Sequence, residues 1–185
     1  MNFETTVPKI AAEFAGAGIR YALIGGLAMA MRGVQRATLD VDFILLLEDL
    51  DKAHDCLLAL GYHRAFHSGN VSHYLADEPA LGRVDLLHAF RGPSLGMLDR
   101  AEMLELVSGR SLPVVHVEDL IGLKIQAALN DPSRHRRDWS DIHLLVENAA
   151  LQATPLDWDL LSDYLALFDL TPELATLKQL YGQTH

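Results

Sequence analysis

The chain has 185 residues, of which half are hydrophobic and 22% are charged, and its formal net charge is −10. This length allows one domain, or a core with an appended lobe, to bury most of its apolar surface without disulfides. The acidic balance excludes a high-affinity, non-specific nucleic-acid binder, since such proteins carry an excess of Lys and Arg. A local basic patch is still compatible with this charge.

Cysteine content and hydropathy indicate the compartment. The single cysteine, Cys56, excludes an internal disulfide and is typical of a reducing compartment. Residues Met1 to Pro8 lack the basic start and apolar run of an export signal. The longest apolar stretch, Tyr21 to Met31, is too short to span a bilayer. We therefore expect a cytoplasmic protein that does not enter a membrane.

The first half of the chain alternates between helical and strand periodicity. The spacing of apolar residues predicts helices at about residues 3–17, 25–31 and 48–60, strands at 21–24, 40–47 and 82–88, and a hairpin over 62–76. The strand at 40–47 is almost continuously apolar, as expected for a strand covered on both faces.

The second half is expected to be mostly helical. A looser region around Pro93 and Gly109 predicts a helix and a short strand pair. Beyond it, the pattern predicts helices at about residues 118–129, 134–149, 157–168 and 172–181. Strands and helices followed by helices only indicate an α/β (α+β) protein with a core over residues 1–115 and a helical C-terminal lobe over residues 116–185, packed on the core.

The residues from Ile24 to Phe43 carry the strongest functional signal. Gly25 and Gly26 follow an apolar strand and precede a helix, where backbone N–H groups can hold a phosphate. Asp40 and Asp42 lie two residues apart in an apolar strand, so their carboxylates point the same way. Two like charges in this setting are costly unless a cation lies between them. Oxygen ligands beside a phosphate site favour Mg²⁺.

A third acid, Asp85, lies in a later apolar strand. The glycine pair, the Asp40-x-Asp42 pair and this lone acid resemble the signature of the nucleotidyltransferase fold superfamily. The resemblance covers roughly residues 20 to 90. It implies a mixed sheet flanked by helices, an enzyme that uses nucleoside triphosphates, and a metal site formed by the three aspartates.

A narrower resemblance is to the AbiEii-type branch, which includes the toxins of type IV toxin-antitoxin systems. It is carried by Arg36-x-Thr38-x-Asp40-x-Asp42, Leu120-x-x-x-Lys124-x-x-Ala127 and Arg137-Asp138-x-x-Asp141-Ile142. The branch implies transfer of a nucleoside monophosphate to an acceptor, which for some members is the 3′ end of tRNA, and an antitoxin partner. Its downstream active-site Lys and Asp fall on Lys124 and Asp138.

Nucleotidyl transfer requires carboxylates that can bind metal ions. Nucleotidyl transfer is an in-line displacement at the α-phosphorus, in which two metal ions can hold the attacking and leaving oxygens. Asp40 and Asp42 would hold the metal on the triphosphate, and Asp85 would share the second metal and help to deprotonate the acceptor hydroxyl.

The remaining predicted site residues would bind the nucleotide. Gly25 and Gly26 would hold the β- and γ-phosphates. Lys124 is a point charge suited to the triphosphate. Arg36 would serve either the triphosphate or the acceptor, and Thr38 either a phosphate or the adjacent backbone.

Structural roles are the competing interpretation of these residues. Asp42 could pair with Arg36, and Asp85 with Arg83 two residues away on the same strand face. An exposed lysine on an amphipathic helix is the default reading of Lys124.

The acids and arginines near residue 138 also have a structural interpretation. Asp138 and Asp141 could form ion pairs with Arg134 and Arg137 on a helix surface. The run from Arg134 to Arg137 is either a solvated helix start or a basic patch for a polyanionic acceptor.

Three functional classes are compatible with the pattern. The first is a magnesium-dependent nucleotidyltransferase whose acceptor is tRNA, a protein or a small molecule of the aminoglycoside type. The second is a non-catalytic binding or regulatory module of the same fold. The third is a metal-dependent phosphohydrolase, since the same carboxylates can serve water as nucleophile.

Overall fold

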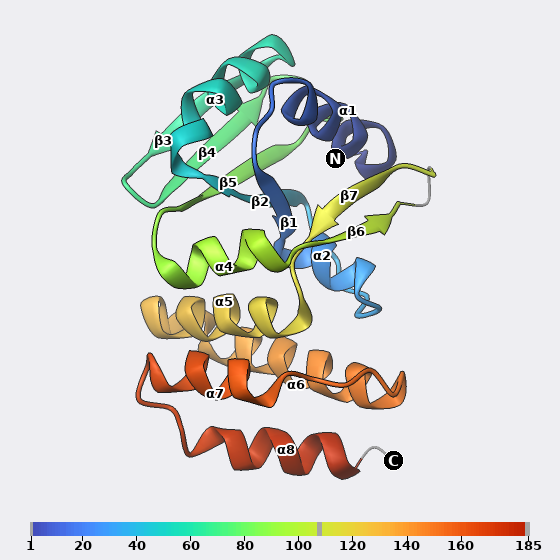
Figure 1. Cartoon of the computed structure of the whole chain (residues 1–185). Helices are drawn as coiled ribbons and strands as arrows, with labels where there is room; N and C mark the ends of the chain where they lie inside the picture. The colour runs from blue at the N-terminus through green and yellow to red at the C-terminus, as the bar shows by residue number, and fades with distance from the viewer. Residues whose placement is uncertain (1, 107–108, 184–185) are drawn as a thin grey trace. The chain divides into compact units, whose positions relative to one another are not determined.

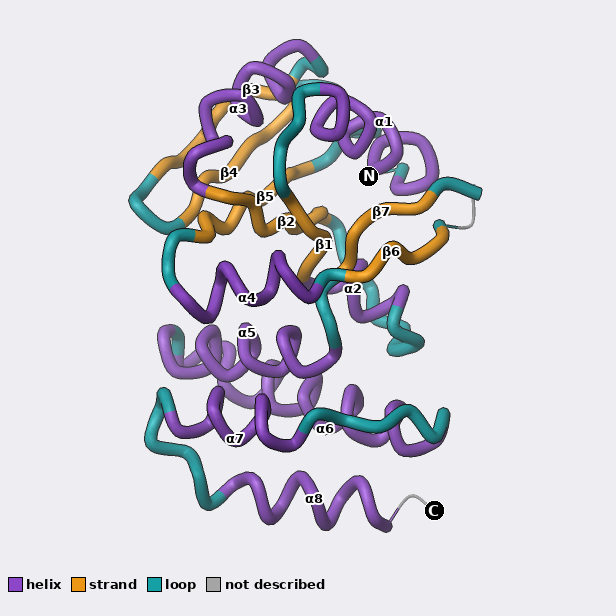
Figure 2. Tube along the Cα trace, in the orientation of Figure 1, coloured by secondary structure: helices purple, strands orange, loops and turns teal. Residues whose placement is uncertain are grey.

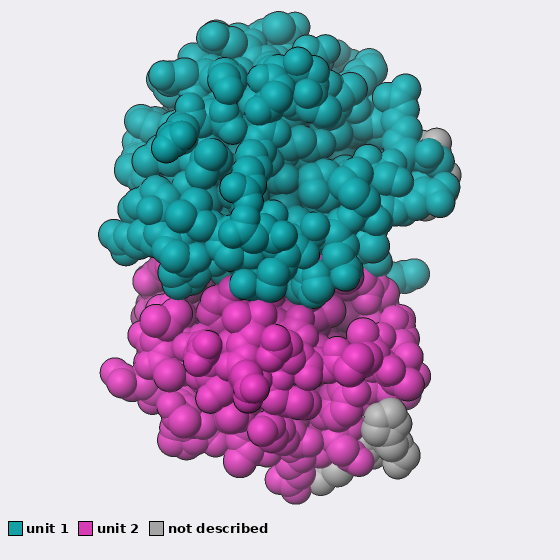
Figure 3. Space-filling model, in the orientation of Figure 1, with its two compact units in different colours: residues 1–31, 35–116 teal, residues 32–34, 117–185 magenta. Residues whose placement is uncertain are grey.

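The computed structural model describes residues 2–106 and 109–183, and the chain divides into two compact units (Figure 3). Unit 1 comprises residues 1–31 and 35–116, and unit 2 comprises residues 32–34 and 117–185. The short segment 32–34 is held within unit 2, where Asn148 Nδ2 donates a hydrogen bond to the carbonyl oxygen of Arg32 at 2.9 Å.

Unit 1 is built from a mixed sheet and helices (Figure 1). The helices are α1 (Phe3–Gly16), α2 (Gly25–Met31), η1 (Leu47–Asp49, a 3-10 turn), α3 (Leu50–Ala59) and α4 (Gly92–Arg100). The strands are β1 (Tyr21–Ile24), β2 (Asp40–Leu46), β3 (Tyr62–His67), β4 (Val71–Ala76), β5 (Arg83–Ala89), β6 (Glu102–Glu105) and β7 (Ser111–Val114).

The strands lie in the order β3-β4-β5-β2-β1-β7-β6, and Figure 2 shows them in orange. β3, β4 and β5 form an antiparallel meander, while β5 runs parallel to β2. β1 pairs antiparallel with β2 and parallel with β7. The parallel pairing of β2 and β5 therefore brings together the two strands that carry the predicted acids.

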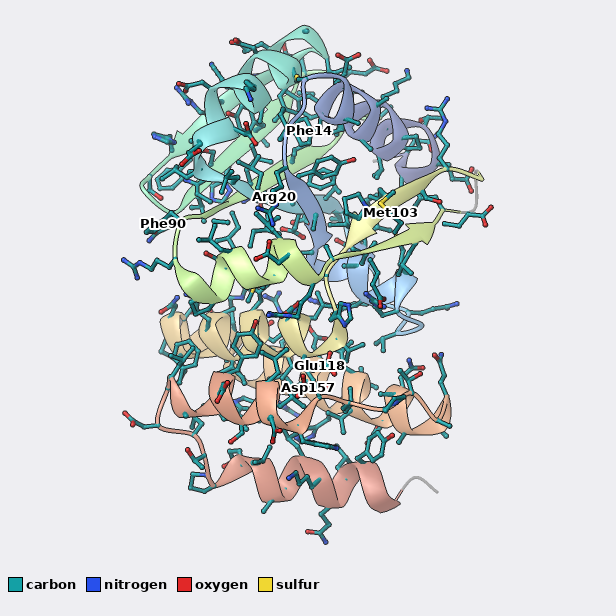
Figure 4. The ribbon with its side chains drawn as sticks, viewed as in Figure 1. Phe14, Arg20, Phe90, Met103, Glu118 and Asp157 are labelled. Atoms are coloured by element: carbon teal, nitrogen blue, oxygen red, sulfur yellow. The ribbon has the colours of Figure 1, made fainter. Side chains whose placement is uncertain are left out.

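One face of β2 is buried against aromatic side chains. Phe43 and the flanking apolar residues of β2 are fully buried. The ring of Phe14 from α1, labelled in Figure 4, lies 5.3 Å from the ring of Tyr21 and 5.7 Å from that of Phe43, both edge to face. Since side chains alternate along a strand, Asp40 and Asp42 project from the opposite face of β2.

Unit 2 is helical. Its elements are α5 (Val117–Asn130), η2 (Pro132–Arg134, a 3-10 turn), α6 (His135–Leu151), α7 (Trp158–Ala166) and α8 (Glu173–Gln183). α5 packs against both α6 and α7. A Cβ atom at Gly122 would lie 2.9 Å from Cγ of Tyr164, so this glycine allows α5 and α7 to approach closely. The Tyr164 hydroxyl donates to Asp119 Oδ1 at 2.6 Å inside this interface.

A second buried acid fixes the start of α7. Glu118 Oε1 accepts a hydrogen bond from the backbone N–H of Asp157 at 2.7 Å (Figure 4). Asp157 in turn caps the helix, because its side chain accepts from the N–H groups of Asp159 and Leu160.

The α/β class predicted from the sequence is confirmed. β1 and α2 have the predicted bounds, and the expected hairpin and strand pair are both formed. The predicted helix at 48–60 is instead divided into η1 and α3. Among the described residues, no helix combines the length and the apolar character that a membrane span needs.

Candidate active site

Three aspartates meet on one face of the sheet of unit 1. Asp40 and Asp42 lie on β2, and the register of the parallel pair places Asp42 directly opposite Asp85 of β5. One carboxylate oxygen from each residue lies within 4.8 Å of the other two. All three side chains are half-buried. Across the described ranges, this is the one group of three or more potential metal ligands.

Gly25 is required by the position of Asp42. It follows β1 with a φ of +69°, a conformation that favours glycine. A Cβ atom here would lie 2.0 Å from Asp42 Oδ2, so any side chain would displace the carboxylate. At Gly26 a Cβ atom would lie 2.9 Å from Cβ of Thr38. Gly25 therefore makes room for Asp42 and Gly26 for Thr38, and the predicted role of the pair in phosphate binding stays a prediction.

Thr38 holds the first acid in place. Its hydroxyl donates to Asp40 Oδ1 at 2.7 Å and lies 3.1 Å from the carbonyl oxygen of Asp40. Arg36, two residues earlier, lines an open groove of about 620 Å³ together with Gln35 and two alanines. Thr38 therefore supports a metal ligand and Arg36 lines a groove, and the predicted nucleotide-binding role of both stays a prediction.

Asp85 is held by two cationic or polar partners. Arg83 Nε lies 2.6 Å and His73 Nδ1 2.8 Å from the same oxygen, Asp85 Oδ1. The hydrogen bond to Asp85 raises the pKa of Arg83, and the negative charges of Asp40 and Asp42 add to this shift. The Arg83–Asp85 pair expected under the structural interpretation is therefore present. It occurs together with the metal-ligand cluster, since Asp85 is also one of the three grouped acids.

His73 is a site residue that sequence reasoning missed. It lies on β4, and the antiparallel register places it directly opposite Asp85. The hairpin pattern predicted β4, but the register between β4 and β5 depends on the connection over residues 77–82, whose geometry the pattern does not define. In the sequence, His73 could have been found only as a polar residue at an alternating position of the strand that precedes the predicted Asp85 strand.

Lys124 and Asp138 lie in unit 2, where they form a buried charge cluster. Lys124 Nζ donates to Asp138 Oδ1 at 3.0 Å and to Asp141 Oδ2 at 2.6 Å. Arg134 Nε adds a bond to Asp138 Oδ2 at 3.1 Å. The side chain of Lys124 is 8% exposed and that of Asp138 is fully buried. The interpretation of both as surface residues is wrong, because the packing of α5 on α6 encloses them; their catalytic role stays a prediction.

The rest of the basic run is exposed. Arg136 and Arg137 lie in the first turn of α6 and line an open groove of about 450 Å³ with Ser133 and Ser140. The carboxylate of Asp141 also lines this groove, so its lining is of mixed charge. Exposure of this run agrees with both interpretations, a solvated helix start and a basic patch, so both stay predictions.

The sheet and its three carboxylates define a class of enzyme, the nucleotidyltransferases. One similar solved structure is that of ANT(2″)-Ia in complex with adenylyl-2″-tobramycin, with a TM-score of 0.67 and 15% sequence identity over 91% of this chain and 99% of that chain. Another is that of the lincosamide antibiotic adenylyltransferase LnuA with lincomycin bound, with a TM-score of 0.53 and 17% identity over 77% of this chain and 95% of that chain. An antigenic nucleotidyltransferase-like protein from Paracoccidioides brasiliensis is also similar, with a TM-score of 0.58 and 20% identity over 95% of this chain and 91% of that chain. At these identities the likeness shows a shared fold.

The family model described as nucleotidyl transferase AbiEii toxin, type IV TA system, matches residues 77–180, more than half of the chain. The chain belongs to this family and is a nucleotidyltransferase. The matched segment includes Asp85, Lys124 and Asp138. No sequence among curated proteins matches the chain. The family and the enzyme class predicted from the sequence are confirmed.

Proposed function

We propose that the protein transfers a nucleoside monophosphate from a nucleoside triphosphate to an acceptor hydroxyl in a Mg²⁺-dependent reaction. The observation that carries this proposal is the convergence of Asp40, Asp42 and Asp85 within 4.8 Å. Three half-buried like charges repel one another, so a cation between them would relieve an electrostatic cost. Their donors are hard oxygens, which suit Mg²⁺ better than a thiophilic metal.

The residues present fit a pair of metal ions. Asp40 and Asp42 would hold one ion together with the triphosphate, and Asp85 would share the second. When bound, the ions would neutralise charge on the triphosphate and on the attacking oxygen. Thr38 would keep Asp40 oriented through its 2.7 Å hydrogen bond. Gly25 leaves the space that the Asp42 carboxylate needs.

Asp85 is the proposed acceptor of the proton. Arg83 Nε donates to its Oδ1 and His73 Nδ1 lies 2.8 Å from the same oxygen, so Oδ2 is the oxygen that we assign to the acceptor hydroxyl. The hydroxyl proton moves to Oδ2, and the hydroxyl oxygen forms a bond to the α-phosphorus. The bond from the α-phosphorus to the bridging oxygen breaks, and pyrophosphate leaves. Asp85 therefore needs a fixed orientation, which its two partners supply.

The other predicted residues have roles proposed from the family resemblance. The N–H groups of Gly25 and Gly26 would bind the β- and γ-phosphates, and Arg36 would bind the triphosphate or the acceptor. Lys124 and Asp138 are proposed as catalytic residues because they match the downstream motifs of the family.

The 3′ end of tRNA is the acceptor that we propose, with the protein acting as the toxin of a toxin-antitoxin pair in a reducing cytoplasm. Membership of the AbiEii family supports the toxin role and an antitoxin partner.

The test incubates the protein with each α-labelled nucleoside triphosphate, Mg²⁺ and one of three acceptor pools: total tRNA, a protein extract or tobramycin. We expect label on tRNA, lost in Asp42→Ala and retained in Asp55→Ala, which removes an exposed acid of α3. Asp42→Ala should keep the fold, since it relieves like-charge repulsion. Transfer that survives in Asp42→Ala would refute the site, and label only on tobramycin would refute the tRNA acceptor.

A further inference from the structure

A row of side chains leads from the metal-ligand cluster to the outer edge of the sheet. The register pairs Asp42 with Asp85, Asp85 with His73, and His73 with Phe66, on β2, β5, β4 and β3 in turn. Directly paired residues project from the same face of a sheet. The contacts agree with this, because His73 Nδ1 meets Asp85 and the His73 ring stacks on Phe66 with centroids 5.2 Å apart and planes 25° apart.

A β-bulge places Phe66 on this face. Arg64 pairs with Tyr74, but Phe66 pairs with His73, so β3 has one extra residue, Ala65, against β4. Without the extra residue, Phe66 would pair with Ser72 and project from the opposite face, because a shift of one residue exchanges the two faces of a strand. Bulges near active sites commonly redirect a side chain in this way.

The stacked rings are accessible. Phe66 is 50% exposed, and the side chain of His73 is 31% exposed. Exposed aromatic rings on a sheet are a common surface for stacking the bases of single-stranded nucleic acid. The neighbouring Arg83, whose side chain is 43% exposed, lies on the same face and is paired with Asp85.

The in-line geometry of nucleotidyl transfer indicates that the surface at Phe66 and His73 lies on the acceptor side. The strand order places β1, which ends at Gly25, on one side of β2, and β5, β4 and β3 on the other. In an in-line displacement the attacking oxygen and the leaving pyrophosphate lie on opposite sides of the phosphorus. If the glycine pair holds the triphosphate, the acceptor approaches from the side of His73 and Phe66.

We propose that Phe66 and His73 form a stacking platform for the terminal nucleobase of an RNA whose ribose hydroxyl is the acceptor. This inference rests on the proposed function and names the subsite that orients its acceptor. The platform lies one to two strand spacings from Asp85, about 5 to 10 Å, which is within the reach of one nucleotide. Phe66 lies on β3, two strands from Asp85, whereas His73 on β4 contacts Asp85.

The experiment measures stacking without turnover. A short single-stranded RNA that ends in 3′-terminal 2-aminopurine is titrated with the full chain in Mg²⁺ and without a nucleoside triphosphate, and fluorescence quenching reports stacking of the terminal base. We expect Phe66→Ala to weaken binding by about 5- to 150-fold and Phe66→Trp to retain it. Leu58→Ala, which removes an exposed leucine of α3, is the matched control and should bind as the wild type does.

The outcomes separate this proposal from the proposed function. Quenching that is equal in the wild type and in Phe66→Ala overturns the platform, whatever the transfer assay shows. Absence of quenching in the wild type also overturns it, even where label transfer to another acceptor establishes the enzyme. Quenching that depends on Phe66 supports the platform by itself, and Asp42→Ala should leave that quenching in place while abolishing transfer.

Discussion

Replacing Gly25 with alanine should damage the metal site through a single contact. The φ of +69° costs a non-glycine residue about 1–2 kcal/mol. The new Cβ would also lie 2.0 Å from Oδ2 and 2.6 Å from Cγ of Asp42, and overpacking of this kind costs about 1–3 kcal/mol. We therefore expect Gly25→Ala to lower the free energy of unfolding by about 2–5 kcal/mol.

The same contact should reduce metal affinity. The Asp42 carboxylate must rotate away from the new methyl group, which removes one of the three ligands from its place. Residues that orient a metal ligand typically contribute 10- to 100-fold in affinity, so we expect Mn²⁺, used as a spectroscopic substitute for Mg²⁺, to bind about 10- to 100-fold more weakly. Electron paramagnetic resonance of free Mn²⁺ measures this affinity, and urea unfolding measures the stability.

Gly18 offers a matched control for this prediction. Its φ is +66°, yet a Cβ atom there would have no heavy atom within 4 Å. Gly18→Ala should therefore lose only the backbone contribution, about 1–2 kcal/mol, and should bind Mn²⁺ like the wild type. Equal stability losses in the two variants, with wild-type Mn²⁺ affinity in Gly25→Ala, would refute the claim that Gly25 positions Asp42.

Two further predictions concern buried charges. Lys124→Met should lower the free energy of unfolding by about 3–5 kcal/mol, because Asp138 and Asp141 stay buried without the ammonium between them; a urea-unfolding loss below about 1 kcal/mol would contradict this. Burial lowers the pKa of His88, whose Nε2 lies 3.0 Å from Ser72 Oγ. The unfolded histidine titrates near pH 6.5, so the unfolded chain binds a proton at a higher pH than the folded chain does. The stability that depends on a neutral, buried His88 is therefore complete above about pH 6.5 and is lost as pH falls toward the folded-state pKa. His88→Gln should flatten that part of the unfolding profile between about pH 7 and pH 5, and an unchanged slope would count against it.

Local patterns in the sequence were sufficient for most of the fold. The apolar run before Gly25 and the helical spacing after it predicted β1 and α2 with their observed bounds. The predicted helix at 48–60 is divided into η1 and α3 where a tertiary contact is made. Asp49 accepts a hydrogen bond from the backbone N–H of Arg20 at 2.9 Å, which belongs to a segment 29 residues away, and the 3-10 turn ends there.

The candidate metal site was likewise predictable in part from local sequence and in part only from strand pairing. Asp40 and Asp42 were predictable because residues two apart in a strand share a face whatever surrounds them. The family resemblance supplied Asp85, but its place opposite Asp42 depends on the pairing of β2 with β5. The support of Asp85 by His73 depends on another pairing, between β4 and β5.

The sequence by itself therefore determined most of the elements and the acid pair, and the family resemblance supplied the enzyme class. Tertiary structure alone decided which side of β3 presents Phe66, because the bulge at Ala65 exists only relative to β4. It also decided that Lys124 is buried, because an amphipathic lysine becomes enclosed only where a second helix supplies its carboxylates. Periodicity is a property of neighbouring residues, whereas register and burial arise from contacts between segments far apart in the chain.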